Sequence, residues 1–138
     1  MDKNYNYRQP WIMQRADPYV LHKDGYYYFT GSMPKYDGIA LRRCESLKGL
    51  AEAEETIIWK RHESGPMSEH VWAPELHYLD GKWYVYFAAG EKEDIWKIRP
   101  YVLECESQDP LAGPWVEKGM MQAADDDAFS FQAFSLDM

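Results

Sequence analysis

An internal repeat constrains the fold of this chain more than any other feature of its sequence. Residues 18–29 match residues 74–85 at an offset of 56 positions, with no gap. Each copy places an Asp-Gly pair between two runs of residues that favour strands, and the second run is rich in aromatic side chains. Because both residues of an Asp-Gly pair tolerate positive φ, each copy predicts a β-hairpin with a tight turn.

Both copies continue in the same way beyond the hairpin. Each reaches a cysteine, Cys44 or Cys105, and then runs through a polar loop to a short segment that holds Trp59 or Trp115. These segments supply a third and a fourth strand. One copy is therefore a unit of about four antiparallel strands in roughly 45 residues, which is the size of a β-propeller blade. A β-sandwich and a pair of unrelated hairpins are the alternatives, and the matching strands favour an all-β propeller.

The repeat also divides the chain. We expect blade one over residues 16–60 and blade two over residues 72–119, and the aromatic segment 129–138 is expected to begin a third blade. The whole chain, 1–138, would then be the N-terminal fragment of a larger propeller domain. Since a closed propeller has about four blades or more, two blades would leave sheet edges open. We therefore expect the chain to need the missing C-terminal blades or self-association for stability.

Charge and hydropathy exclude several partners and sites. The 23 acidic and 15 basic residues give a net charge of -8, and an acidic protein repels nucleic-acid phosphates. No apolar run approaches the roughly 20 residues that span a membrane. The polar residues 1–8 are followed by no apolar signal segment, which predicts a cytoplasmic location. The two cysteines fall on equivalent strands of neighbouring units, beyond the roughly 7 Å Cα separation that a disulfide allows.

Residues that begin the innermost strand of a blade lie near the mouth of the central channel. Asp17 has this position in the first copy, and the second copy has Ala73 there, which indicates that the fold itself does not require the carboxylate. A turn residue, as in many Asp-Pro pairs, is the alternative. Asp137 would begin the inner strand of the third unit, and an ordinary C-terminal residue is the alternative there.

Three further side chains are candidates for the same channel mouth. Trp72 precedes the second inner strand, where its ring face could stack on a sugar or form part of an ordinary core. Glu75 could be a buried, hydrogen-bonded acid, and Tyr36 lies in a loop that could close over the mouth. The His and Cys residues lack the short spacing of a metal site, so none is predicted.

Four segments, taken together and in order, carry a family resemblance: residues 16–20, 24–28, 70–75 and 80–84. They resemble glycoside hydrolase family 43, which contains α-L-arabinofuranosidases, endo-arabinanases and β-xylosidases on a five-bladed β-propeller. The Trp-Ala-Pro-Glu segment before an Asp-Gly-Lys hairpin is the most specific part. The resemblance covers nearly the whole chain, but only about the first half of a catalytic domain. It implies an all-β chain that supplies two blades and the start of a third.

The resemblance also implies roles for the candidate residues. Asp17 matches the general base of the family, and Asp137, in a Ser-Leu-Asp context, matches the residue that tunes the pKa of the acid and orients the substrate. The family's general acid, a Glu, has no counterpart in this chain. Trp72, Tyr36 and Glu75 would bind substrate. No cofactor is expected to be required; calcium occurs in some relatives, but no ligand set is identifiable here.

The implied reaction is the hydrolysis of O-glycosidic bonds in pentose-containing plant polysaccharides or oligosaccharides, of the α-L-arabinofuranosidase or β-xylosidase type. The family inverts the anomeric configuration, which needs a base and an acid roughly 6.5–9.5 Å apart with a water between sugar and base. The expected partner is an arabinose- or xylose-containing oligosaccharide. Without the acid, we expect the truncated chain to be inactive. The alternative is a non-catalytic, sugar-binding or degenerate half-propeller.

Overall fold

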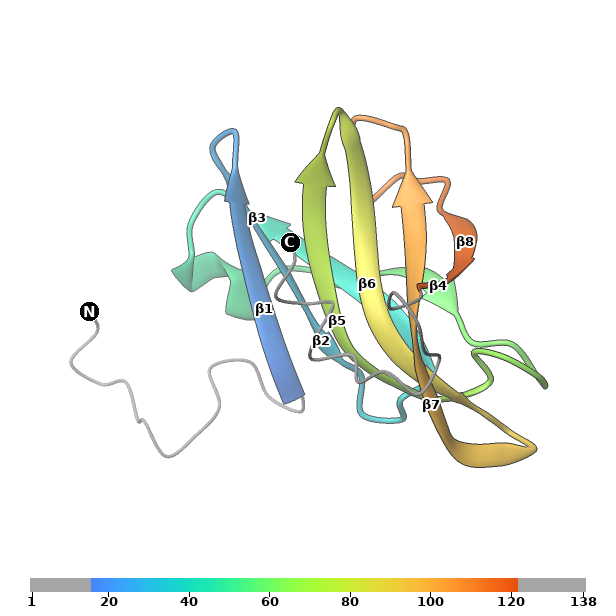
Figure 1. Cartoon of the computed structure of the whole chain (residues 1–138). Helices are drawn as coiled ribbons and strands as arrows, with labels where there is room; N and C mark the ends of the chain where they lie inside the picture. Colours follow the sequence, from blue (N-terminus) through green and yellow to red (C-terminus); the bar gives the residue numbers. More distant parts are fainter. Residues whose placement is uncertain (1–15, 122–138) are drawn as a thin grey trace.

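The computed structural model describes residues 16–121, and they form two four-stranded antiparallel sheets in which neighbouring strands follow one another along the chain (Figure 1). The first sheet contains β1 (Ala16–Lys23), β2 (Tyr26–Ser32), β3 (Gly38–Cys44) and β4 (Thr56–Lys60). The second contains β5 (Glu69–Leu79), β6 (Lys82–Glu91), β7 (Asp94–Cys105) and β8 (Val116–Met120). A short 3₁₀ helix, η1 (Lys48–Ala51), lies between β3 and β4.

The two predicted hairpins have the same backbone geometry. Asp24 and Gly25 have φ of 52° and 84°, and Asp80 and Gly81 have φ of 51° and 83°. Positive φ at both central residues is the mark of a type I′ turn, whose twist matches that of the flanking strands. The repeat of 56 positions is therefore a repeat of backbone conformation as well as of sequence.

The cysteines also follow the repeat. In the strand register, Cys44 of β3 lies opposite Tyr27 of β2, and Cys105 of β7 lies opposite Trp83 of β6. Trp83 is the residue that corresponds to Tyr27 in the repeat. Both thiols are free. Burial raises the pKa of the Cys105 thiol, which keeps it neutral and makes it a packing group rather than a nucleophile.

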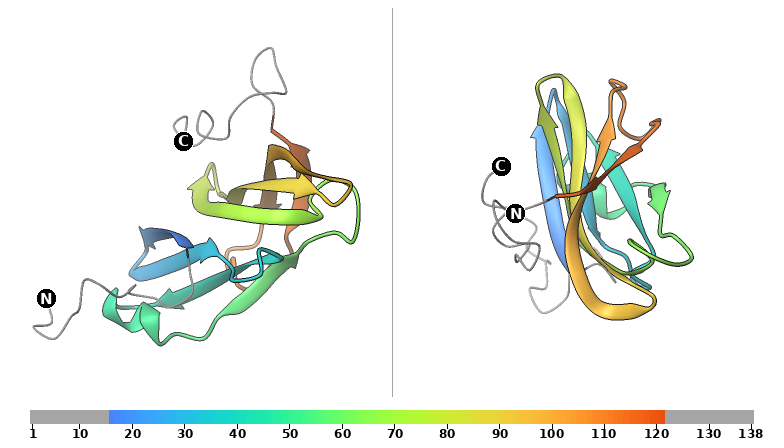
Figure 2. Two further views of the ribbon diagram at one scale, coloured as in Figure 1. Left: turned by 90° about the horizontal axis from the view of Figure 1, so that it is seen from below. Right: turned by 45° about the vertical axis from the view of Figure 1, so that its right-hand side comes forward.

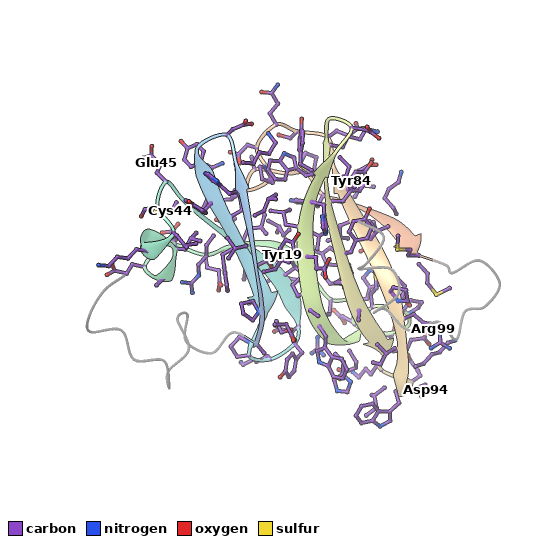
Figure 3. All side chains as sticks on the ribbon, turned by 60° about the vertical axis from the view of Figure 1, so that its left-hand side comes forward. Tyr19, Cys44, Glu45, Tyr84, Asp94 and Arg99 are labelled. Carbon is purple, nitrogen blue, oxygen red and sulfur yellow. The ribbon has the colours of Figure 1, made fainter. Side chains whose placement is uncertain are left out.

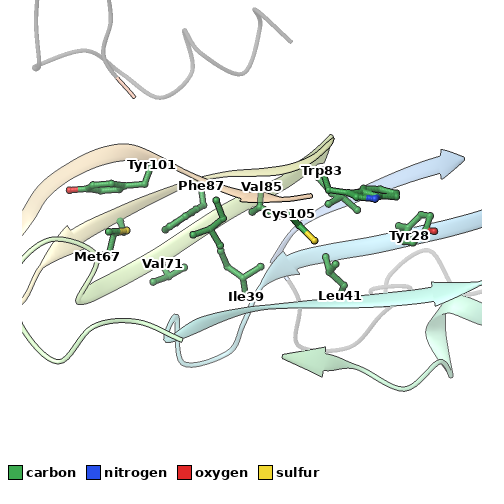
Figure 4. Close-up of a cluster of buried hydrophobic side chains, with 13 residues drawn as sticks. Tyr28, Ile39, Leu41, Met67, Val71, Trp83, Val85, Phe87, Tyr101 and Cys105 are labelled. Carbon is green, nitrogen blue, oxygen red and sulfur yellow. The ribbon is translucent and has the colours of Figure 1, made fainter. Parts of the chain in front are cut away.

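The hydrophobic core lies between the two sheets, which face one another as separate layers (Figure 2). Figure 4 shows side chains of both sheets meeting in this space. Tyr28 of β2 contacts Trp83 of β6 with 5.0 Å between ring centroids, and Trp59 of β4 contacts Phe87 at 5.1 Å. The fully buried members include Ile39, Leu41, Val71, Leu76, Val85, Phe87 and Leu103. Each such side chain contributes about 1.5–3 kcal/mol by leaving water, so this interface is what holds one sheet against the other.

Polar contacts also link the outer strands of the two sheets and the loops beside them. The indole N–H of Trp59 donates to Glu117 Oε2 at 2.8 Å, and His62 Nε2 donates to the same oxygen at 2.7 Å. Burial alone would raise the pKa of the Glu117 carboxyl, but these two hydrogen bonds outweigh it, so the pKa lies below its usual value. A second link joins Arg43 Nη1 to Asp109 Oδ1 at 2.9 Å.

The second sheet begins at Glu69, three residues before the expected start at 72. Register shifts on both sides of Trp72 show that β5 enters the sheet through irregular pairing, which the repeat pattern does not reveal. The predicted start of a third blade, residues 129–138, lies outside the described residues. Within the described part of the chain, no helix is long and apolar enough to cross a bilayer.

Candidate functional site

One end of the two inner strands collects most of the candidate residues. Figure 1 shows the starts of β1 and β5, the loop between β2 and β3 and the turn between β6 and β7 together at the lower end of the molecule. Asp17 lies at the start of β1, Trp72 near the start of β5, and Tyr36 in the loop between β2 and β3. The two Asp-Gly turns lie at the opposite end.

Backbone strain is concentrated on the segments of this end. Seven residues other than glycine have positive φ among residues 16–121, and two of them are the Asp residues of the hairpin turns. The other five are Asp17, Tyr36, Met67, His70 and Ala73. A residue held in this region costs about 1–3 kcal/mol, and such residues cluster where a protein positions a ligand or a catalytic group. The strain therefore singles out this end of the sheets as the candidate site.

A chain of two hydrogen bonds positions Asp17. Ser32 Oγ, at the end of β2, donates to Asp17 Oδ2 at 2.9 Å and accepts from the backbone N–H of Ala73 at 2.8 Å. Ser32 is 1% exposed, whereas the Asp17 carboxylate is open to solvent. The buried hydroxyl thus fixes one oxygen of an accessible carboxylate and ties it to the second sheet.

Asp17 and Ala73 also match in backbone conformation. They are 56 positions apart, and their φ values are 53° and 52°. Asp adopts this left-handed region more readily than Ala does, because its short polar side chain can hydrogen-bond locally. The conformation therefore belongs to the start of each inner strand, and the carboxylate of Asp17 is an addition to it.

Two of the predicted aromatic residues meet at the same end of the sheets as this carboxylate. Trp72 directly precedes Ala73, and Tyr36 contacts it edge to face, with 6.2 Å between ring centroids and 81° between ring planes. The backbone carbonyl of Tyr36 accepts from the N–H of Val71 at 3.0 Å, which fixes the loop against β5. Two aromatic rings thus gather at the same end of the sheets as an accessible carboxylate, and such a combination can bind the apolar face of a neutral polar ligand.

Glu75 does not contact Asp17, Tyr36 or Trp72 through any described hydrogen bond; its described partner is His77. Its Oε1 lies 3.1 Å from Nε2 of His77, two residues further along β5. The His77 ring contacts Tyr19, which lies between β1 and β5 (Figure 3), at 5.4 Å. Burial raises the pKa of the Tyr19 hydroxyl, and the Glu75 carboxylate raises it further, so the hydroxyl stays protonated near neutral pH. The structure thus places Glu75 in a polar cluster between the sheets, and the prediction that it binds substrate stays untested.

Two further points of the sequence analysis concern Asp137 and metal ligands. Asp137 lies outside the described residues, so its predicted role stays a prediction. Between residues 16 and 121, no group of three or more His, Cys, Asp or Glu side chains has an arrangement that could hold a metal ion.

Ser32 is a site residue that was not predicted from the sequence, although the repeat contains a signal for it. Residue 88, 56 positions after Ser32, is Ala. The strand pairing is equivalent as well, because Ser32 pairs with Ala16 and Ala88 pairs with Trp72. The first copy thus has Asp and Ser where the second has two alanines, and these two departures together indicate the hydrogen-bonded pair.

Solved structures confirm the predicted fold, an all-β chain that supplies two blades of a five-bladed propeller. An α-L-arabinofuranosidase from Lactobacillus brevis superposes with a TM-score of 0.76 at 45% identity, over 86% of this chain and 39% of that one. A thermostable family-43 glycoside hydrolase superposes with a TM-score of 0.60 at 20% identity, over 84% of this chain and 36% of that one, which supports the fold alone.

Two curated relatives come from Streptomyces, and both are called extracellular exo-α-(1→5)-L-arabinofuranosidases. The protein of Streptomyces avermitilis is 53% identical over 95% of this chain and 26% of its own length. The protein of Streptomyces chartreusis is 51% identical over 95% of this chain and 38% of its own length. The chain therefore spans between about a quarter and two fifths of these relatives.

The predicted cytoplasmic location is wrong, because both Streptomyces relatives are called extracellular. The prediction rested on the lack of an apolar segment after residues 1–8. A secretory signal is removed from a mature protein, so the lack of one in a sequence does not indicate where the protein works.

A family model extends the match along almost the entire chain. The model for glycosyl hydrolases family 43 matches residues 7–137, which include Asp17, the Trp72 segment and both Asp-Gly hairpins. This confirms the resemblance that the four sequence segments indicated. With relatives at about half identity over the same residues, the chain belongs to family 43 of the glycosyl hydrolases.

Proposed function

We propose that the protein carrying this chain hydrolyses α-L-arabinofuranosidic bonds in arabinose-containing polysaccharides or oligosaccharides. The observation that carries the proposal is the accessible Asp17 carboxylate, which Ser32 holds and ties to the backbone N–H of Ala73, the residue after Trp72. Family membership and the names of the Streptomyces relatives support the reaction class and favour arabinose over xylose. As only part of those relatives is matched, the activity is proposed for a chain that also supplies the remaining blades.

In the proposed reaction, Asp17 is the general base. Its free oxygen accepts a proton from a water molecule, which attacks the anomeric carbon from the face opposite the leaving oxygen. A carboxylic acid on the other side of the sugar protonates that oxygen, and the two carboxyl groups stand roughly 6.5–9.5 Å apart so that the water fits. We propose that Asp137 tunes this acid and that the acid itself is a Glu of a later blade.

The hydrogen bond from Ser32 suits this role for Asp17. A general base must hold one oxygen toward the water through the whole reaction, and misplacement by about 1 Å can reduce the rate roughly a hundredfold. The Ser32 hydroxyl restricts rotation of the carboxylate, and the strained backbone at Asp17 restricts the main chain. Trp72 and Tyr36 would then hold the sugar ring over the carboxylate.

The test is the substitution Asp17→Asn in a chain extended to the full length of the relatives. We expect kcat on an aryl α-L-arabinofuranoside to fall by about 10²–10⁴, because general base catalysis is lost while the shape of the side chain is kept. An aryl β-D-xyloside run in parallel tests the preference for arabinose. The unextended chain of 138 residues is expected to be inactive because it offers no match to the general acid.

Asp24→Asn is the matched control. It makes the same chemical change in an Asp of the same backbone conformation, at the far end of β1, and Asn-Gly forms a type I′ turn as readily as Asp-Gly. Equal activity of the wild type and Asp17→Asn would refute the assignment of the base. An extended wild-type protein that binds arabinose oligosaccharides but never cleaves them would support the sugar-binding alternative instead.

A further inference from the structure

Trp96 is a large apolar side chain that the fold leaves in solvent. It lies near the start of β7, beside the turn at the lower end of Figure 1, and 71% of its surface is exposed. Figure 3 shows the neighbouring Asp94 at this same end. Trp is highly buried on average in folded proteins, so an exposed Trp near a candidate site indicates that it contacts a ligand or another part of the protein.

Trp96 is the outer member of a continuous series of rings. It contacts His70 with 5.4 Å between ring centroids, and His70 stacks on Trp72 at 4.9 Å with 16° between the ring planes. Tyr36 completes the series by its edge contact with Trp72. We call these four residues the aromatic row. Trp72 directly precedes Ala73, whose N–H donates to the Ser32 hydroxyl that holds Asp17, so the row begins next to this chain of hydrogen bonds.

The hairpin that carries Trp96 is firmly fixed. The buried Ser68 joins it to the preceding loop, because its Oγ accepts from the N–H of Lys92 at 2.6 Å and its own N–H donates to the carbonyl of Gly90 at 3.1 Å. At Gly90 an added Cβ would lie 2.6 Å from the carbonyl oxygen of Ile95, so the two strands approach as closely there as only glycine permits. Trp96 is therefore presented on a rigid support.

We propose that the aromatic row is a subsite for a further sugar residue of an arabinose oligosaccharide, with Trp96 as its outer platform. The proposal rests on the proposed function, since it names how the same site takes a longer substrate. Aromatic rings offer a flat apolar face with polar edges, which suits the C–H face of a neutral sugar. Because the hairpin is already ordered, binding there loses little conformational entropy.

The experiment measures binding by calorimetry, in the full-length protein with Asp17→Asn to prevent turnover. The probes are arabinose and α-1,5-linked arabinotriose. We expect the added substitution Trp96→Ala to weaken triose binding about 2- to 12-fold, the range for one aromatic contact, and to leave arabinose binding unchanged. Trp96→Phe is expected to restore most of the loss. Tyr26→Ala removes another exposed ring, 40% exposed, at the opposite end of the sheet and is expected to change neither affinity.

Unchanged triose affinity in the Trp96→Ala variant would overturn the proposal. So would an equal loss for both sugars accompanied by a lower unfolding temperature, because that result would assign Trp96 a structural role against another part of the protein. The proposed function is tested separately, by measuring hydrolysis of arabinotriose with the full-length wild-type protein, which keeps Asp17. A protein that binds triose through Trp96 without cleaving it would keep the subsite and refute the hydrolase.

Discussion

Ser32 is buried, and its hydroxyl makes two hydrogen bonds. It donates to the carboxylate of Asp17, the proposed base, and it accepts from the backbone N–H of Ala73 in the other sheet. A hydroxyl can do this because it offers one donor and two acceptor lone pairs. Alanine keeps the β-carbon of serine but has neither the hydroxyl donor nor its acceptor lone pairs. The two hydrogen bonds therefore predict a specific effect of removing the oxygen.

For Ser32→Ala we expect kcat of the full-length protein to fall about 10-fold or more while KM changes little, since a hydrogen bond to a charged group contributes about 1.5–3 kcal/mol. Steady-state kinetics on an aryl α-L-arabinofuranoside provides the measurement. Ser32→Thr keeps the hydroxyl and is expected to recover part of the rate. Ser46→Ala is the control, because the Ser46 hydroxyl accepts a local hydrogen bond from Gly49 in an exposed loop. A loss that appears only in KM would contradict a positioning role.

Between strands, the link from β8 to β4 and the loop after it fixes the outer part of the two sheets. Glu117 of β8 accepts from Trp59 of β4 and from His62 in the loop after it. The hydrogen bonds lower the pKa of its carboxyl in the folded protein. The link therefore contributes stability that depends on pH.

The sign follows from the direction of this shift. A carboxyl with a lowered folded pKa stabilises the protein fully above its unfolded value, about 4.5, and the contribution is lost as the pH falls through the folded pKa. We expect Glu117→Gln to lower the unfolding temperature at pH 6–7, and the difference from the wild type to shrink below about pH 4.5. Thermal unfolding at a series of pH values measures this. Glu106→Gln, at an exposed carboxylate that pairs with Lys82, is the control. A difference that persists unchanged in acid would count against the link.

At the scale of the whole molecule, the layer of buried hydrophobic side chains between the two sheets is the main source of stability. Leu41 of β3 is fully buried in this layer, whereas Ile57 on the neighbouring β4 is 50% exposed. The two positions separate the effect of burial from that of the residue type.

We expect Leu41→Ala to lower the free energy of unfolding by about 2–5 kcal/mol, because it removes buried methyl groups and leaves a cavity between the sheets. Ile57→Ala, the matched control, is expected to change it by no more than about 0.5 kcal/mol. Urea unfolding of the full-length protein measures both. Similar costs at the two positions would show that the layer between the sheets is not the main source of stability.

The sequence alone predicted the features that depend on neighbouring residues. Asp-Gly pairs specify type I′ turns locally, and alternating aromatic and apolar residues specify strands, so the meander of each unit could be read from the repeat. Asp17 was found in the same way, as a departure between the two copies. The start of β5 was expected at 72 because bulged pairing leaves no periodic signal.

The three-dimensional fold alone determined which distant residues meet. Ser32 donates to Asp17 across 15 positions and accepts from Ala73 across 41, and both of these partners have positive φ. Likewise, Trp96 joins the aromatic row only because the hairpin of β6 and β7 is folded against the start of β5. Such contacts depend on the packing of one sheet on the other, and no local pattern encodes it. The sequence thus determined the strands and the carboxylate, and the packing of the sheets determined the site around them.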